Sequence, residues 1–280
     1  MSHLKRHWPM FQADPNRIYF QAHRGSVDER PENTLVAFRH AWHFPGAIPE
    51  TDVRTTRDGV LICLHDATLA RTTDAPDEYK DVPVSRLTEA EVRRWDAGVR
   101  FSPAYAGQHV PTLREVLAEL SGHPERALYL EVKDADFQAL GRLLDEYGVW
   151  DQILFIAGNP AWLLELQRLF PGVPTMTWLS GSPEKIQAGF EHLARTDFAG
   201  ITQLQMHLHA AADQDAIRYL LDEAFLQYAQ ERLRKVGAVL QLRPFRFDGP
   251  SLRRLIDLGV HWFVADAPEQ FSAALAAARR

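Results

Sequence analysis

The chain has 280 residues, enough to bury one large core, with the 46% hydrophobic and 24% charged content of an ordinary globular protein. Its net charge of -6 and its lack of a long Lys/Arg run exclude nucleic acid as the main partner. A single cysteine, Cys63, excludes an intrachain disulfide. No stretch reaches the roughly 18–20 apolar residues of a membrane span, and residues 1–10 lack the apolar core of a signal peptide. We therefore expect a cytoplasmic protein without integral membrane association.

Short strand patterns alternate with longer helical patterns along the chain. Strands are expected, in chain order, at 18–22, 47–53, 60–65, 127–132, 153–157, 173–178, 200–203, 238–242 and 260–264. Helices are expected at 34–44, 113–120, 136–147, 161–170, 183–194, 215–236, 251–258 and 268–278, with Asn33 and Ser251 as N-caps or first-turn residues. This alternation is typical of an α/β fold with a parallel sheet.

Nine strands are one too many for a (β/α)8 barrel, and the spacing of two of them resolves the excess. About six residues separate 47–53 from 60–65, and they include the turn signal Asp58-Gly59. A parallel crossover needs about a dozen residues or more, so 60–65 is expected to return as a hairpin that extends strand 2. The sequence thus predicts a TIM barrel, as a single domain over 1–280. Residues 67–110, polar and rich in turns, are expected to form a small insertion with a short helix near 88–95.

Two carboxylates, Glu50 and Asp52, lie one residue apart at the end of the expected strand 47–53. Because side chains alternate along a strand, both face one side, where two anions repel each other unless a cation lies between them. Hard oxygen ligands of this kind suit Mg²⁺ or Ca²⁺. The alternative is a solvated strand end whose acids pair with Arg54 or Arg57.

A second pair of charged side chains, Glu131 and Lys133, ends the expected strand 127–132. Glu131 would complete a set of carboxylate ligands, and Lys133 would hold a phosphate or sugar oxygen. The alternative is an ion pair between these two residues.

Imidazole and guanidinium groups also follow apolar strands. His23 and His65 have ordinary pKa values of about 6.5, so one could deprotonate a nucleophile while the other protonates a leaving group. The alternative for each is a structural imidazole. The planar fork of Arg24 suits a phosphate, or a salt bridge with Asp28 or Glu29.

Two further acids are expected to support these groups without contacting the substrate. Glu32 follows Pro31 in a turn before a helix, where it either interacts with the helix end or orients Arg24. Asp66 follows His65 directly and is placed in the same supporting role.

Weaker signals lie in the second half of the chain. Arg243, with Arg246, follows the expected strand 238–242 and would contact an anionic substrate group at the mouth of the barrel. His207 and His209 are expected in a loop, where a second metal site is disfavoured. Because chemistry in these barrels takes place at the carboxyl ends of the strands, the strand-end residues are expected to form one site.

In order and spacing, these motifs resemble the glycerophosphodiester phosphodiesterase family. The resemblance is dense over 20–74 and clear at 128–133 and 258–268. It rests on His23-Arg24-Gly25, Pro31-Glu32-Asn33-Thr34, Glu50-Thr51-Asp52, Arg57-Asp58-Gly59, His65-Asp66, Arg71-Thr72-Thr73 and Glu131-Val132-Lys133. The segment 241–245 and the loop after Gln203 depart from the family pattern.

The resemblance implies a TIM barrel with one divalent cation, Ca²⁺ or Mg²⁺. Its metal ligands would be Glu50, Asp52 and Glu131, its acid/base pair His23 and His65, and its phosphate-binding residues Arg24 and Lys133. The implied reaction hydrolyses a small-molecule glycerophosphodiester to glycerol 3-phosphate and an alcohol, in lipid and glycerol metabolism. The alternatives are a phospholipase-type relative, a relative specific for phosphosugar diesters, and a non-hydrolytic phosphosugar-binding or transferase derivative. A homo-oligomer is compatible with the sequence.

Overall fold

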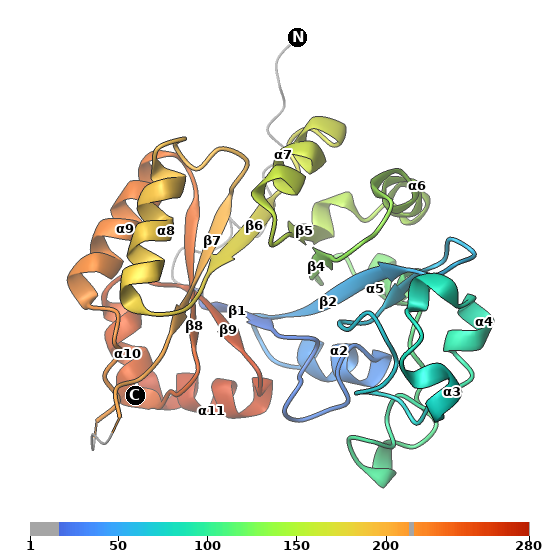
Figure 1. The fold of residues 1–280 in the computed structure, drawn as a ribbon. Coiled ribbons are helices and arrows are strands. Elements are labelled where there is room, and N and C mark those ends of the chain that lie inside the picture. The colour runs from blue at the N-terminus through green and yellow to red at the C-terminus, as the bar shows by residue number, and fades with distance from the viewer. Residues whose placement is uncertain (1–16, 213–215, 280) are drawn as a thin grey trace. The chain divides into compact units, whose positions relative to one another are not determined.

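The computed structural model describes residues 17–212 and 216–279 (Figure 1). The N-terminal residues in which we expected no signal peptide, and the first residue of the helix expected at 215–236, lie outside the described residues. The strand order is β1-β9-β8-β7-β6-β5-β4-β2-β3, and β1 also pairs with β2, which closes the sheet into the predicted TIM barrel. Contacts divide the chain into two compact units, Ala22–Phe155 and the remainder, which are described in turn.

The unit Ala22–Phe155 is built around three strands with fixed register. β2 (Ala47–Thr55) pairs antiparallel with β3 (Leu61–Cys63), so the predicted hairpin is confirmed. β2 also pairs in parallel with β4 (Leu128–Val132), and this register sets Asp52 opposite Glu131. The unit also contains α2 (Leu35–Trp42), α5 (Leu113–Ser121), α6 (Phe137–Tyr147), the 3-10 turn η3 (Trp150–Gln152) and most of β5 (Ile153–Ile156).

The insertion at 67–110 forms short helical turns around an apolar core that it shares with β3 and the residue after it, Leu64. Its elements are α3 (Asp77–Lys80), η1 (Val84–Arg86), α4 (Glu89–Val92) and η2 (Pro103–Tyr105). The helix expected at 88–95 is the single turn α4, which a reciprocal capping box between Thr88 and Glu91 begins. The core of the insertion consists of buried apolar side chains from 62–110: Ile62, Leu64, Leu69, Ala75, Val84, Leu87, Val92, Ala97 and Val110.

In the other unit, strands and helices alternate regularly. After most of β1 (Tyr19–Ala22), it contains α7 (Pro160–Leu169), β6 (Thr175–Leu179), α8 (Pro183–Ala194), β7 (Gln203–Leu208), α9 (Glu223–Lys235), β8 (Val239–Pro244), α10 (Gly249–Asp257), β9 (Trp262–Ala265) and α11 (Pro268–Ala278). β6, β7, β8 and β9 pair in parallel in that order. α8 packs against β6 and α9 against β8, and the two helices lie side by side (Figure 1).

Two expected elements of this unit are displaced in the structure. The strand expected at 200–203 is β7, three residues later, because Gln203 and Gln205 are buried along with the apolar residues between them. Buried polar side chains interrupt the apolar run by which a strand of a parallel sheet is predicted, so the bounds of this strand were misplaced. The helix expected from residue 215 begins only at Glu223, where the side chain of Asp222 caps it. In the part of the chain that the structure describes, no helix has the length and apolar content to cross a bilayer.

Candidate active site

Three carboxylates converge where β2 lies beside β4. Each of Glu50, Asp52 and Glu131 offers an oxygen, and these oxygens all lie within 4.8 Å of one another. Glu50 and Asp52 are each 1% exposed, so water screens their charges poorly. The structure thus brings the three acids into one cluster, as the strand-end pattern predicted.

The pKa values in this cluster reflect the repulsion between neighbouring buried carboxylates. Burial raises the pKa of Glu50 well above its usual range, and the neighbouring Asp52 and Glu131 raise it further. Burial and the charge of Asp52 likewise raise the pKa of Glu131. For Asp52, burial opposes ionisation, but the positive charges of Lys133 and His65 and a hydrogen bond from Asn33 outweigh it and lower the pKa. A bound cation would relieve the repulsion that these shifts report.

The two buried acids are each held by one oxygen and leave the other without a hydrogen bond. Glu50 Oε2 accepts a hydrogen bond of 2.7 Å from the backbone N–H of Arg24, and Asp52 Oδ2 accepts one of 2.8 Å from Asn33 Nδ2. Glu50 Oε1 is buried without a hydrogen-bond partner among the described residues, and Asp52 Oδ1 accepts no hydrogen bond there but lies 3.1 Å from Lys133 Nζ. Carboxylates oriented in this way, with Glu50 Oε1 unpaired and Asp52 Oδ1 already facing a cationic group, fit a hard divalent cation.

The ammonium group of Lys133 lies beside the acidic cluster. Its Nζ is 3.1 Å from Asp52 Oδ1 and also forms an ion pair with Glu131. Burial lowers the pKa of Lys133, but the charges of Asp52 and Glu131 outweigh that effect and raise it. The predicted alternative of a Glu131–Lys133 ion pair is therefore present, and it extends to Asp52.

Arg24 connects the cluster to a second acid, Glu32. Besides the backbone bond to Glu50, its Nη1 donates to Glu32 Oε1 at 3.0 Å, and its Nε lies 3.8 Å from Asp52 Oδ2. The residue has a left-handed backbone with φ of 51°, and both its N–H and its side chain contact these acids. Glu32 is thus a partner that orients the guanidinium group, as one of the two predicted roles for this acid stated.

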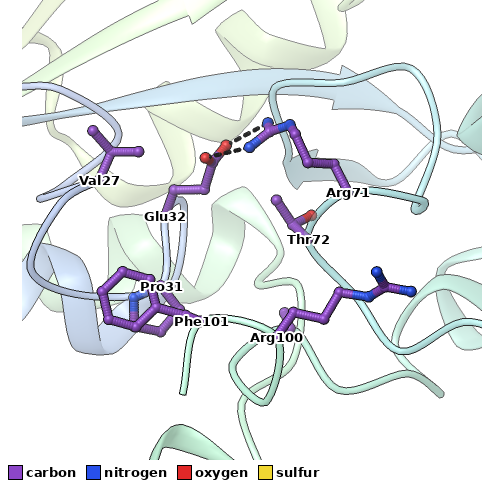
Figure 2. A pocket seen from close by; sticks show the side chains of 8 residues that line it. Val27, Pro31, Glu32, Arg71, Thr72, Arg100 and Phe101 are labelled. Carbon is purple, nitrogen blue, oxygen red and sulfur yellow. Dashed lines mark hydrogen bonds and ion pairs between the residues drawn. The ribbon is translucent and has the colours of Figure 1, made fainter.

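His65 is fixed by a chain of hydrogen bonds that leads back to Glu32. Its Nδ1 lies 2.7 Å from Asp66 Oδ1, and Arg71 Nε donates to Asp66 Oδ2 at 2.7 Å. Hydrogen bonds from Arg71 lower the pKa of Asp66 to about 2, so Asp66 is ionised and His65 Nδ1 carries the proton. Arg71 also donates to both oxygens of Glu32, at 2.6 and 2.8 Å, as Figure 2 shows.

The other predicted residues occupy two different places. His23 is the first residue after β1, half-buried, and its carbonyl accepts a hydrogen bond of 3.2 Å from Val27 N–H. Arg243 belongs to the other unit, where its Nη2 donates to Asp266 Oδ1 at 2.7 Å. Its predicted contact with the substrate stays a prediction.

The histidines expected in a loop are placed differently in the structure. His207 lies within β7, because that strand extends to Leu208. His209 stacks on the ring of Phe245 at a centroid distance of 4.7 Å, and His207 meets the same ring edge-on at 5.1 Å.

Sequence reasoning did not identify Asn33 and Arg71 as site residues. Asn33 precedes Thr34, which is the N-cap of α2, and its backbone is left-handed with φ of 54°. Its amide oxygen accepts from Thr51 Oγ1 at 2.9 Å and from Asp52 N–H at 3.1 Å, which holds the end of β2 in place. The motifs Pro31-Glu32-Asn33-Thr34 and Arg71-Thr72-Thr73 were the signals that could have identified both.

The chain is similar to proteins of one known family. A family model described as the glycerophosphoryl diester phosphodiesterase family matches residues 23–270. A protein of Caldanaerobacter subterraneus named glycerophosphodiester phosphodiesterase is 32% identical over 54% of this chain and 62% of its own length. One of Bacillus subtilis with the same name is 26% identical over 92% of this chain and 86% of its own length.

A solved structure supports the fold. The glycerophosphodiester phosphodiesterase of Agrobacterium tumefaciens superposes with a TM-score of 0.71, covering 91% of this chain and 99% of that one, at 24% identity. At that identity, the likeness supports the TIM-barrel fold alone.

Proposed function

The chain belongs to the glycerophosphoryl diester phosphodiesterase family, as its motifs predicted, and we propose that it hydrolyses glycerophosphodiesters to glycerol 3-phosphate and an alcohol. The observation that carries this proposal is the cluster of Glu50, Asp52 and Glu131, whose oxygens lie within 4.8 Å of one another beside Arg24 and Lys133. Such a site combines carboxylates for a metal with cations for a phosphate.

Glu50, Asp52 and Glu131 would hold one divalent cation, Ca²⁺ or Mg²⁺, because hard oxygen ligands suit both ions. When bound, the cation supplies positive charge that offsets the charge developing on the phosphoryl oxygens. Arg24 and Lys133 would bind those oxygens from the protein side, since Glu32 orients the first and Glu131 the second.

His65 and His23 would exchange the protons of the reaction. Because Asp66 accepts the Nδ1 proton of His65, the Nε2 atom of that ring is the one available to a reacting oxygen. His23 would act on the opposite side of the phosphorus, as base when His65 is acid or the reverse. The cytoplasmic location and a homo-oligomeric state stay predictions.

The test is a panel of glycerophosphodiesters with and without a chelator, in which release of glycerol 3-phosphate is measured. We expect activity that the chelator abolishes and added Ca²⁺ or Mg²⁺ restores. No hydrolysis of any diester with metal present would overturn the proposal.

Variants test the assigned residues separately. His23→Ala and His65→Ala should each lower turnover by at least about 10²-fold while the fold persists by circular dichroism. His123→Ala, an exposed histidine paired with Glu125, serves as the control. Wild-type turnover in either site variant would contradict the acid/base roles.

The ligand set has its own measurement. Glu50→Gln should abolish binding of the divalent cation in calorimetry, whereas Glu146→Gln, at a surface ion pair with Arg114, should leave it unchanged. An unchanged affinity of Glu50→Gln for the divalent cation would contradict the assignment of Glu50 as a metal ligand.

A further inference from the structure

A pocket of about 170 Å³ lies between the insertion and the loop that carries Arg24 and Glu32. We propose that this pocket receives the alcohol part of the diester and favours alcohols that carry an anionic group such as a carboxylate. The inference rests on the proposed function and specifies its substrate class.

The pocket has an apolar side and a polar side (Figure 2). Val27, Pro31 and Phe101 lie on one side, and Arg71, Thr72 and Arg100 lie on the other, with Glu32 between them. We call this space the insertion pocket. Its walls suit a small molecule with a short carbon body and a polar end.

The wall of the insertion pocket is continuous with the candidate active site. Glu32 lines the pocket and also accepts the hydrogen bond from Arg24, a proposed phosphate ligand. Arg71 lines it as well and binds Asp66, the partner of His65. The pocket wall is therefore linked to Arg24 through Glu32, and to His65 through Arg71 and Asp66, so we infer that an alcohol leaving the phosphate would lie in this pocket.

Charge determines which alcohol fits. Arg24, Glu32, Arg71 and Asp66 form one chain of ion pairs whose formal charges cancel. Arg100 lines the pocket with an exposed side chain whose guanidinium group points away from Glu32 (Figure 2), and it forms no hydrogen bond or ion pair within residues 17–212 and 216–279. It therefore places one positive charge at the edge of the pocket that the described chain does not pair. An anionic group on the alcohol would pair with it.

The loop that presents Arg100 and Phe101 is held in place by Asp96. The carboxylate of Asp96 accepts backbone N–H bonds from Gly98 at 2.7 Å, from Val99 at 2.8 Å and from Gly107. A Cβ at Gly98 would lie 2.1 Å from the carbonyl oxygen of Tyr105, so only glycine fits there.

Aromatic contacts hold Phe101, part of the apolar wall, in position. The ring of Tyr105 packs edge-on against Phe101 at 5.6 Å, and Arg30 of the facing loop lies 5.8 Å from the Tyr105 ring. A pocket ordered before the ligand arrives loses little entropy on binding, which favours selectivity.

The experiment compares glycerophosphoserine with glycerophosphoethanolamine, because the two alcohols differ by one carboxylate. We expect the wild type to have the higher kcat/KM for the serine diester. Arg100→Gln should lower the serine-to-ethanolamine ratio of kcat/KM about fivefold, chiefly through KM, and Arg100→Glu should lower it further. Arg94→Gln, which removes an exposed charge stacked on Trp95 in the same insertion, should leave the ratio unchanged.

The possible results distinguish a failure of the pocket inference from a failure of the proposed hydrolytic activity. Hydrolysis of both diesters with the same ratio in wild type and Arg100→Gln would overturn the inference and leave the proposed function standing. The same unchanged ratio, with inhibition by inorganic phosphate lost in Arg100→Gln, would indicate a free-anion site and also overturn it. No hydrolysis of either diester, or of any other, would overturn both.

Discussion

Replacement of Asn33 by alanine should destabilise the protein more than any surface substitution, because this side chain makes three buried hydrogen bonds. Its amide oxygen accepts from Thr51 Oγ1 and Asp52 N–H, and its amide nitrogen donates to Asp52 Oδ2. Asn33, Thr51 and Asp52 are 2%, 0% and 1% exposed, so water cannot replace the lost bonds. The change thus leaves two donors and one carboxylate oxygen buried without these partners.

The expected loss in the free energy of unfolding is about 4 kcal/mol. Three buried hydrogen bonds contribute about 1 kcal/mol each. Alanine at the left-handed backbone of residue 33, where φ is 54°, adds about 1 kcal/mol, since asparagine tolerates this conformation better. Asn33→Gly avoids the backbone cost and should lose about 3 kcal/mol.

Urea denaturation followed by circular dichroism, with chelator present, measures both values. Calorimetry should also show weaker divalent-cation binding in both variants, because Asp52 loses the bond that orients it. Losses below about 1 kcal/mol in both variants would refute the assigned role of the three hydrogen bonds. A loss in Asn33→Gly that exceeds that in Asn33→Ala would refute the backbone part of the reasoning.

Four other predictions concern stability and the accessibility of a buried thiol. Lys133→Met should destabilise the metal-free protein by about 3 kcal/mol, because buried acids lose their cation, and added Ca²⁺ should stabilise this variant more than the wild type; equal gains would contradict this. Asp66 has its pKa lowered to about 2, so its contribution to stability should be full above its unfolded value of about 3.9 and be lost as pH falls toward 2; a wild-type advantage over Asp66→Asn that persists at pH 2 would contradict this. Gly98→Ala should cost about 1–3 kcal/mol by overpacking against Tyr105, and an unchanged urea midpoint would exclude the clash. Burial raises the pKa of Cys63 to about 12, so a thiol reagent at pH 8 should label it only in denaturant; rapid labelling of the folded chain would disprove its burial.

The parts of the fold that short-range rules govern were predictable from the sequence. The turn at Asp58-Gly59 is too short for a parallel crossover, so the hairpin of β2 and β3 followed directly. Alternation along a strand placed Glu50 and Asp52 on one face, and the same rule applied to Glu131 on the neighbouring strand.

The parts that depend on partners far along the chain were not predictable. Arg71 binds Glu32, which lies 39 residues away, and no local pattern specifies such a pair. β7 was displaced because Gln203 and Gln205 are buried, against the usual preference of glutamine for the surface. The structure pairs Arg243 with Asp266, 23 residues away, a partner that no spacing rule indicated, and its predicted contact with substrate stays a prediction.

The apolar core of the insertion has a consequence for how substrate preference changes between relatives. The carboxylates come from β2 and β4, whereas Arg100 and Phe101 come from a loop of the insertion, whose buried cluster also includes Ile62 of β3. None of the three clustered carboxylates lies in residues 96–107. If Arg100 sets the preference for an alcohol as inferred above, exchanging this segment between relatives should transfer that preference while the carboxylate cluster is retained.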